Sequence, residues 1–307
     1  MVHGLYASVV LIWGLTWIAI KLQLGLVPAP VSIAYRFAIA AVVLFAWLLA
    51  TGRLQRLQAA DHGFCLLQGL CLFCLNFLCF YNATAYIPSG VVAVVFSTAT
   101  LWNAFNGRLF LGTAITARVL GGAGLGLLGI GALFWPELRG QGAGADTLYG
   151  LALALAGTYN FSLGNMISAH QQRRGLRPLT SNAWGMLYGT GLLLLYVLAA
   201  GIPLRFDPAP GYVLALLYLA IPGSVIGFTA YLTLVGRIGP DKAAYATVLF
   251  PVVALNVSAW VEGYQWSPLA LAGLAAVLAG NVLVFRRPAT ARADSSSSVR
   301  ERVGVRA

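Results

Sequence analysis

The sequence predicts an all-α integral membrane protein with ten transmembrane helices, arranged as two inverted five-helix repeats with both termini in the cytoplasm. Three observations predict this fold class: the composition, the long apolar runs and the placement of the basic residues. Of the 307 residues, 60% are hydrophobic and 9% are charged, whereas a soluble domain carries about 25% charged residues. The mean hydropathy of +0.83 agrees with this, so a water-soluble globule is excluded.

A helix needs about 20 mainly apolar residues to cross the hydrocarbon of a bilayer, and ten such stretches occur. They cover residues 4–22, 31–51, 63–83, 88–107, 117–135, 148–168, 181–201, 211–235, 241–261 and 268–285. A β-barrel would alternate apolar and polar residues over segments of about ten, but runs such as 148–156 and 270–278 are continuously apolar. We therefore expect helices. The first span is expected to be retained, because no basic region precedes it as in a signal peptide.

The basic residues predict the orientation. Of the 19 lysines and arginines, all but Lys21, Arg36, Arg139 and Arg205 lie beside the loops that follow even-numbered spans or in the C-terminal tail. Basic residues stay in the cytoplasm during insertion, so both termini are expected there. The net charge of +11 then reflects topology and contact with anionic lipid. Nucleic acid binding is not expected, since short loops offer no basic surface for it.

A repeat relates the two halves of the chain. It is seen between spans 5 and 10 at a constant offset of 151 residues, where Gly122, Gly129 and Phe134 match Gly273, Gly280 and Phe285. Five helices per half is an odd number, so the second half must be inverted, and the loop charges change sides accordingly. Inverted repeats are typical of secondary transporters, whose substrate site lies near the midplane between the halves. We expect one repeat at 1–141, a second at 142–287 and a disordered cytoplasmic tail at 288–307.

Few residues in the spans can carry acid–base, redox or metal chemistry. Seven of the eight acidic residues fall in loops or the tail, and Glu262 lies at the outer end of span 9. We expect Glu262 to face water at the interface, with a role in coupling as the alternative. The four cysteines lie in span 3 and include Cys71 and Cys74 in a CxxC pattern, but no second ligand pair supports a metal. We expect them to be small buried hydrophobes, and we expect no cofactor and no enzyme.

Two cations and several glycines have two interpretations each. Arg36 lies about 9 Å of helix rise inside span 2, and Lys21 ends span 1. Each could attract a substrate carboxylate, but we expect both to extend to the headgroups instead. The GxxxG pairs of span 5 (Gly122 and Gly126) and span 7 (Gly185 and Gly189) let helices approach closely. Packing within the chain is expected, with a dimer face as the alternative.

Uncharged polar and aromatic residues inside the spans are the candidates for substrate binding. Such groups must face protein or a cavity in a membrane, and rings beside amides suit an amphipathic substrate. Aromatic belts at the interface explain tryptophans and tyrosines near span ends, but not those in the middle of spans. The candidate substrate-binding residues are Trp17, Tyr81, Trp102, Asn103, Tyr159, Asn160, Tyr245 and Asn256.

The first span carries Trp13-Gly14-x-x-Trp17 followed by Lys21, and Pro251 and Glu262 precede Gly273 near the end. This pattern resembles the EamA family of the drug/metabolite transporter superfamily over residues 1–286, and is most similar to bacterial inner-membrane exporters of aromatic amino acids. The resemblance implies that spans 1, 3, 4, 6, 8 and 9 line a central cavity, with Trp17 in it, and that spans 5 and 10 brace the fold. The first half departs from the pattern: Leu101 and Thr113 stand near the places of the proline and the glutamate.

Together these observations predict a secondary transporter in the bacterial inner membrane. We expect export of small organic solutes, aromatic or neutral amino acids first, by alternating access. Transport is expected to be driven by the gradient of the substrate, with proton exchange as the alternative. The expected partners are an amino acid substrate and membrane lipid, and a monomer is consistent with the sequence. The alternatives are an exporter of drugs or paraquat-type cations, and a carrier of nucleotide sugars with the same fold.

Overall fold

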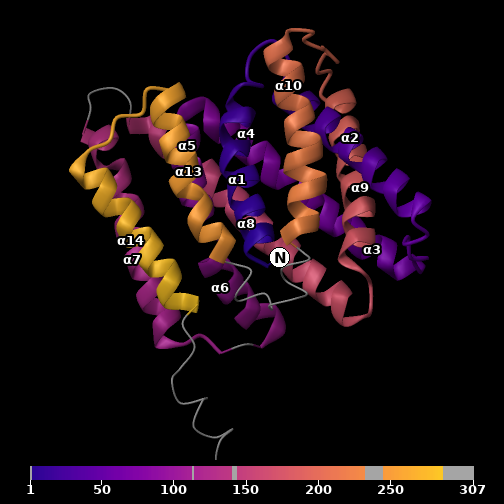
Figure 1. The fold of residues 1–307 in the computed structure, drawn as a ribbon, viewed down its shortest axis with the longest axis horizontal. Helices are drawn as coiled ribbons and strands as arrows, with labels where there is room; N and C mark the ends of the chain where they lie inside the picture. Colours follow the sequence, from indigo (N-terminus) through magenta and orange to yellow (C-terminus); the bar gives the residue numbers. More distant parts are fainter. Residues whose placement is uncertain (1, 113, 140–143, 232–244, 286–307) are drawn as a thin grey trace, which may run out of the picture.

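The structure is a computed structural model that describes residues 2–112, 114–139, 144–231 and 245–285 (Figure 1). Every secondary-structure element within these ranges is a helix, which confirms the predicted all-α class. The elements in chain order are α1 (Val2–Lys21), α2 (Ala29–Ala50), α3 (Ala59–Gln68), η1 (Gly69–Leu75), α4 (Asn76–Tyr86), α5 (Ser89–Phe96), α6 (Ala99–Leu111), α7 (Ala117–Arg139), α8 (Gly144–Arg173), α9 (Pro178–Ala199), α10 (Pro210–Tyr218), η2 (Leu219–Ile226), α13 (Tyr245–Val261) and α14 (Pro268–Phe285).

Five helical stretches are long and apolar enough to cross a membrane. They are His3–Lys21, Ala29–Ala50, Ala59–Tyr86, Pro178–Ala199 and Pro210–Tyr231, which correspond to predicted spans 1, 2, 3, 7 and 8. The other five predicted spans are helical where the structure describes them, in α5 with α6 and in α7, α8, α13 and α14. The total of ten crossings stays a prediction, and the tail at 288–307 lies outside the described residues.

The fourth predicted span is broken rather than continuous. Helix α5 ends at Phe96 and α6 begins at Ala99. At the break, the Ser97 hydroxyl donates to the carbonyl of Val94 and the Thr98 hydroxyl to that of Val95, both at 2.6 Å. Side-chain hydroxyls bonded to nearby carbonyls compete with the helical hydrogen bonds and bend helices. The length of an apolar run in the sequence does not indicate such a break.

Asn281 of α14 stabilises the broken span from the side. Its amide nitrogen donates to the Ser97 hydroxyl at 3.2 Å, and its carbonyl oxygen accepts from the Thr100 hydroxyl at 2.5 Å. All three side chains are buried, so these hydrogen bonds satisfy polar groups that would otherwise be costly in an apolar interior. Helix α14 thus holds the break in place.

Two spans contain a π-helical turn. Segment η1 lies between α3 and α4, and η2 follows α10. Pro222 lies inside η2 and has no amide hydrogen to donate to a preceding carbonyl. In the same segment, the Ser224 hydroxyl donates to the Leu219 carbonyl at 2.9 Å. Short π-helical turns often mark functional sites. Both turns lie next to the cavity described below.

The helices pack around α1, which lies in the interior of the bundle (Figure 1). Helix α1 contacts α13 and α5 on one side and η2 and α4 on the other. Helices α7 and α14 lie side by side at one edge of the molecule, while α2, α9 and α3 form the opposite edge. The pair α7 and α14 therefore flanks the bundle, as the family resemblance implies for spans 5 and 10.

Glycines bring α7 and α14 into backbone contact. A Cβ atom added at Gly129 would lie 2.5 Å from the carbonyl oxygen of Gly273, and one added at Gly280 would lie 2.6 Å from that of Gly122. Elsewhere, a Cβ atom at Gly189 would lie 3.0 Å from the carbonyl oxygen of Gly69 in η1. These contacts confirm the expectation that the glycine pairs of spans 5 and 7 pack within the chain.

We expect Gly129→Ala to destabilise the protein, because the new methyl group meets backbone atoms of α14 that cannot move independently. Overpacking of this kind costs about 1–3 kcal/mol, which should lower the thermal unfolding midpoint of the purified protein by several degrees. Gly131→Ala in the same helix is the matched control, since its Cβ atom would meet nothing within 4 Å. Equal midpoints for the two variants would contradict the contact.

Candidate functional site

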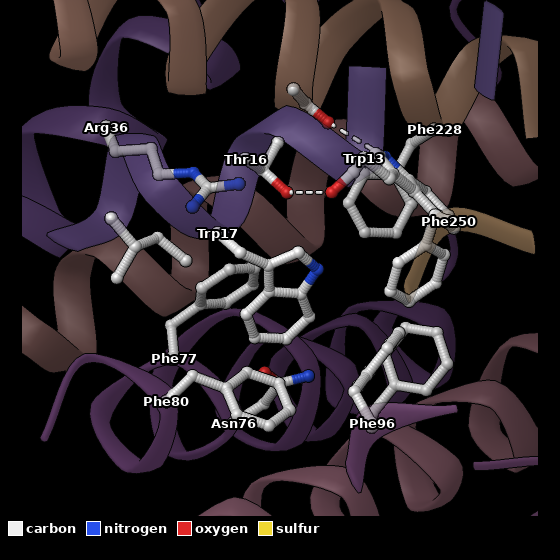
Figure 2. Close-up of a pocket in the computed structure, with 13 residues that line it drawn as sticks. Trp13, Thr16, Trp17, Arg36, Asn76, Phe77, Phe80, Phe96, Phe228 and Phe250 are labelled. Atoms are coloured by element: carbon white, nitrogen blue, oxygen red, sulfur yellow. Dashed lines mark hydrogen bonds between the residues drawn. The ribbon is translucent and has the colours of Figure 1, made fainter. Parts of the chain in front are cut away.

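A cavity lies between helices from both halves of the chain (Figure 2). It has about 50 Å³ of space for water-sized molecules, enough for only a few waters. Helices α1, α2, α4, α5, α8 and α13 and the span that contains η2 all contribute to its wall. The lining residues are Trp13, Thr16, Trp17, Ile20, Arg36, Asn76, Phe77, Phe80, Phe96, Phe161, Gly223, Phe228 and Phe250. Spans 1, 3, 4, 6, 8 and 9 line the cavity as the resemblance implied, and Arg36 adds span 2.

Trp17 is the centre of an aromatic cluster in this cavity. Its ring lies 5.1 Å from that of Phe80, 5.5 Å from that of Phe96 and 6.2 Å from that of Phe250, measured between centroids. Phe96 also contacts Phe161 of α8 at 4.6 Å. Edge-to-face and offset ring pairs are favourable at such distances. The cluster joins four helices and offers apolar surface for a planar group.

Some polar atoms in the cavity wall have a hydrogen-bond partner, whereas others have none among the described residues. Trp13 donates its indole N–H to the carbonyl of Gly223 at 3.2 Å. In contrast, Trp17 Nε1, Asn76 Oδ1 and Arg36 Nη1 are buried and have no hydrogen-bond partner among the described residues. Unpaired buried polar groups are costly and call for an explanation such as water or a ligand. Three of them in one cavity make it the candidate binding site.

Arg36 does not extend to the headgroups, so that expectation was wrong. Only 2% of its surface is exposed, and its guanidinium lies over the Phe77 ring at 4.4 Å and near the Phe37 ring at 5.1 Å. Its Nε atom donates to the Ser224 hydroxyl of η2 at 3.1 Å. Cation–π contacts and this hydrogen bond keep the charge inside the bundle. Figure 2 shows the side chain reaching in beside Thr16 and the aromatic rings.

Of the predicted site residues whose side chains the structure describes, Trp17 alone is among those lining the cavity. Tyr81 is fully buried beside it, one residue from Phe80. Its hydroxyl donates to Gln23 Oε1 at 2.6 Å and interacts electrostatically with Arg36. Tyr81 therefore lies behind the cavity wall, where it contacts the cation of the site.

Four other predicted residues lie on α6 and α8, two helices that pack against each other. The Trp102 and Tyr159 rings are 5.1 Å apart, edge to face, and Asn103 Oδ1 accepts from Asn165 at 3.4 Å. Asn160 donates to the carbonyl of Ala156 in its own helix. This α6–α8 cluster is separate from the cavity wall, although Tyr159 lies two residues from Phe161.

The remaining two predicted residues lie on α13. Asn256 is exposed, and its side chain donates to the carbonyl of Val252 one turn earlier at 2.7 Å. The structure therefore does not bring Asn256 to the cavity. The side chain of Tyr245 lies outside the described residues, so its place in a site stays a prediction.

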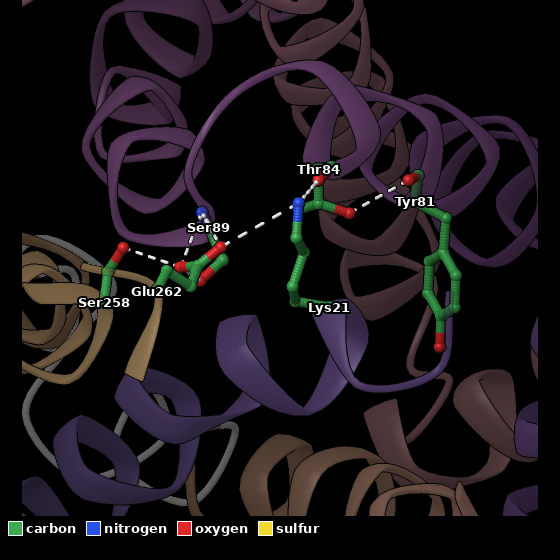
Figure 3. Close-up of polar contacts among 6 residues, drawn as sticks. All are labelled: Lys21, Tyr81, Thr84, Ser89, Ser258 and Glu262. Atoms are coloured by element: carbon green, nitrogen blue, oxygen red, sulfur yellow. Dashed lines mark hydrogen bonds and ion pairs between the residues drawn. The ribbon is translucent and has the colours of Figure 1, made fainter. Parts of the chain in front are cut away.

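Glu262 does not face water, so that expectation was wrong. Its side chain is 11% exposed, and the carboxylate accepts from the Ser89 amide at 3.0 Å, the Ser89 hydroxyl at 2.5 Å and the Ser258 hydroxyl at 2.6 Å. Lys21 Nζ lies 4.0 Å from it and donates to the carbonyl of Thr84 at 2.6 Å. We call these five residues the Glu262 latch (Figure 3).

The Glu262 latch joins four helix ends. Ser89 begins α5, where unpaired amides and the helix dipole favour a negative charge. The carboxylate from the end of α13 fills this position, and Lys21 from the end of α1 bonds to α4. Ser89 in the first turn of α5 thereby supplies hydrogen bonds that water would otherwise donate to the Glu262 carboxylate. The latch fixes the ends of α1, α4, α5 and α13 to one another.

Sequence reasoning missed the phenylalanines and Asn76. The candidates were uncharged polar and aromatic residues, and all of those chosen were tryptophans, tyrosines and asparagines. A usable signal was Asn76, because an amide inside an apolar span must face protein. Phe80 follows it by four residues and so shares its helix face. Both side chains line the cavity.

The described residues hold no group of three or more histidine, cysteine or acidic side chains that could bind a metal. The four cysteines are free, and Cys65 and Cys74 are buried, in agreement with the expected role as small hydrophobes. The site therefore offers binding through rings, one guanidinium and two neutral polar side chains.

Comparisons with known proteins agree with this architecture. The model of the EamA-like transporter family matches residues 3–135 and, separately, residues 148–286. A solved crystal structure shares the fold with a TM-score of 0.65 at 20% identity, over 91% of this chain and 94% of that one.

Relatives at the sequence level are bacterial membrane proteins. The chain is 28% identical to the uncharacterized inner membrane transporter YedA of Escherichia coli, over 92% of this chain and 89% of that one. It is 25% identical to a probable amino-acid metabolite efflux pump of Salmonella typhimurium, over 92% and 95%. A probable terminal-alkyne amino-acid exporter of Streptantibioticus cattleyicolor is 26% identical over 69% of each chain.

Proposed function

Because the chain belongs to the EamA-like transporter family, we propose that it exports small organic solutes, aromatic or neutral amino acids first, by alternating access. Membership makes it a transporter rather than an enzyme, and its relatives and apolar helices make it a multi-pass protein of the bacterial inner membrane. The observation that carries the substrate proposal is the cavity around Trp17, whose rings suit a planar apolar group and whose unpaired polar atoms suit a polar end. The names of two relatives, an efflux pump and an exporter for amino acids, support the same class.

We propose that the transport unit consists of two inverted repeats, 1–141 and 142–287, with ten spans and cytoplasmic termini. The two separate family matches support this division. So do the glycines related by the offset of 151 residues, which meet across α7 and α14, and the π-helical turns η1 and η2, which begin at corresponding places in the halves. The cavity then lies between the repeats, where a substrate site is expected in this class.

Alternating access is supported by the size of the cavity and by the Glu262 latch. Pockets for small molecules have volumes of about 300–1,000 Å³, so a cavity of about 50 Å³ must widen to hold an amino acid. The latch joins the ends of α1, α4, α5 and α13, and we propose that it keeps this end of the bundle closed. Opening that end requires the Glu262 contacts to break.

We propose that transport is facilitative, driven by the gradient of the substrate. Among the described residues, no acidic side chain lines the cavity, and the Glu262 carboxylate is held by hydroxyls, an amide and Lys21. A proton-coupled carrier usually needs an intramembrane carboxylate.

We also propose that the α6–α8 cluster with Trp102, Asn103, Tyr159 and Asn160, together with Tyr81, Tyr245 and Asn256, contributes to the substrate path outside the cavity.

The alternatives fit the cavity less well. A carrier of nucleotide sugars would need several cations to neutralise phosphates, whereas Arg36 is the one basic side chain in the described lining. In an exporter of drug cations, the positive charge of Arg36 in the cavity wall would repel the substrate. Both alternatives remain outcomes of the test below.

The test is uptake of labelled phenylalanine, tryptophan and threonine into liposomes that hold the purified protein, with and without a pH gradient. We expect saturable uptake of the aromatic amino acids that is independent of the gradient. Uptake that occurs only with the gradient would contradict facilitation and point to Glu262. Protein-free liposomes are the control. No uptake by folded protein under either condition would favour the drug or nucleotide-sugar alternatives.

A further inference from the structure

We propose that Arg36 binds the carboxylate of the transported solute, so that the site selects aromatic carboxylates and the amino group of an amino acid is dispensable. This inference rests on the proposed function, because it names the chemistry that the same cavity requires of its substrate. It is carried by the burial of Arg36, by its unpaired nitrogen and by the charge of the cavity wall.

The charge of Arg36 has no counterion in the described part of the chain. Lys21 pairs with Glu262 and Arg174 with Asp61, and neither pair includes Arg36. Rings and hydroxyls surround its guanidinium instead. A buried charge in a membrane protein is costly unless it is paired. A carboxylate brought by the substrate would supply the missing charge.

One terminal nitrogen of the guanidinium has no partner that could compete with such a carboxylate among the described residues. Nε is used by Ser224, whereas Nη1 is buried and has no hydrogen-bond partner among the described residues. Arg36 itself lines the cavity, and Figure 2 shows its guanidinium reaching in among the rings. Guanidinium presents planar N–H donors that match carboxylate oxygens. Nη1 is thus an unsatisfied donor that a substrate carboxylate would satisfy once the cavity widens.

Among the described residues that line the cavity, none is acidic, so no carboxylate there can pair with an ammonium group. The polar side chains that accompany Arg36 are neutral, and Asn76 Oδ1 is the unpaired acceptor among them. Phe77, the ring closest to the charge, is already covered by the guanidinium. The described wall is therefore net positive. An amino acid would bind through its carboxylate and its ring, with the ammonium group contributing little.

The test measures thermal stabilisation of the purified full-length protein by four compounds, since a ligand that binds the folded state raises the unfolding midpoint. Phenylalanine and 3-phenylpropionate carry the carboxylate, and the second lacks the amino group. Phenylalaninamide and phenethylamine carry the ammonium group without a carboxylate. We expect both carboxylates, and neither amine, to raise the midpoint at equal concentrations.

Variants separate an anchor from a structural role. Arg36→Gln should weaken binding of both carboxylates by about 10- to 100-fold, the usual effect of losing a charge-assisted hydrogen bond. Arg36→Lys keeps the charge and should retain part of the affinity. Arg53→Gln is the matched control, because it removes an exposed arginine that lies over Trp47 and does not line the cavity. The four-compound comparison on the unmodified protein stands even where Arg36→Gln does not fold.

The outcomes distinguish this inference from the proposed function. The amines could stabilise the protein as much as 3-phenylpropionate does while phenylalanine is still transported. That result would overturn the anchor and leave amino-acid export intact. Binding of 3-phenylpropionate without any binding or transport of amino acids would support the anchor and contradict amino-acid export. No stabilisation by any of the four compounds would overturn the anchor.

Discussion

Trp17→Ala is expected to lower the initial rate of phenylalanine uptake at least about tenfold at sub-saturating concentration, a loss of about 1.4 kcal/mol in binding. The indole contacts the rings of Phe80, Phe96 and Phe250 and has an unpaired N–H in the cavity. Its removal takes away the surface on which a substrate ring would stack. The measurement is the initial uptake rate into liposomes with matched amounts of protein.

Two further variants make the Trp17 result interpretable. Truncation of a buried tryptophan costs about 3–5 kcal/mol of stability, so Trp17→Phe serves as the variant that keeps a ring and removes the N–H. It should fold normally and transport better than Trp17→Ala. Trp260→Ala is the matched control for loss of a tryptophan, because that side chain is 89% exposed. Uptake by folded Trp17→Ala at the rate of the unmodified protein would remove Trp17 from the site.

Glu262→Ala should release the first turn of α5. The carboxylate accepts three hydrogen bonds from Ser89 and Ser258, and a hydrogen bond to a charged group contributes about 1.5–3 kcal/mol. Its loss should speed hydrogen–deuterium exchange in the peptide that covers Ser89–Phe96 by about 10- to 100-fold. Peptide-resolved exchange measured by mass spectrometry on the protein in micelles reports this directly.

A second carboxylate provides the control for the latch. Asp61 caps α3 through the amide of Gln58 at 3.1 Å and pairs with Arg174, in contacts that do not involve α5. Asp61→Ala should therefore speed exchange near its own helix and leave the α5 peptide unchanged. Equal exchange of that peptide in Glu262→Ala and in the unmodified protein would show that the latch does not stabilise α5.

The sequence was a good guide to where helices lie, because apolar run length and composition are local properties. It predicted α1, α2, α9 and the spans at 59–86 and 210–231 closely. It missed the break after Phe96, since that depends on side-chain hydroxyls bonded to neighbouring carbonyls rather than on hydropathy. Local apolarity cannot distinguish a continuous span from a broken one.

The charged residues were placed wrongly for a different reason. A single arginine or glutamate near a span end is expected to seek water, and that argument considers one helix at a time. Arg36 is held by Ser224, 188 residues away, and Glu262 by Ser89, 173 residues away. Only tertiary packing brings these partners together. The aromatic cavity wall was partly missed for the same reason, because each phenylalanine alone resembles a residue for lipid contact.

Photo-crosslinking with 4-azidophenylalanine tests directly whether the cavity around Trp17 is the substrate site. This aromatic amino acid would be bound to the purified protein, irradiated, and its adducts mapped by mass spectrometry with and without excess phenylalanine. We expect adducts on peptides of α1, α4 and α13, at or beside Trp17, Phe80 and Phe250, and we expect excess phenylalanine to abolish them. Displaceable adducts on other helices, with none on α1, α4 and α13, would contradict a substrate site in this cavity.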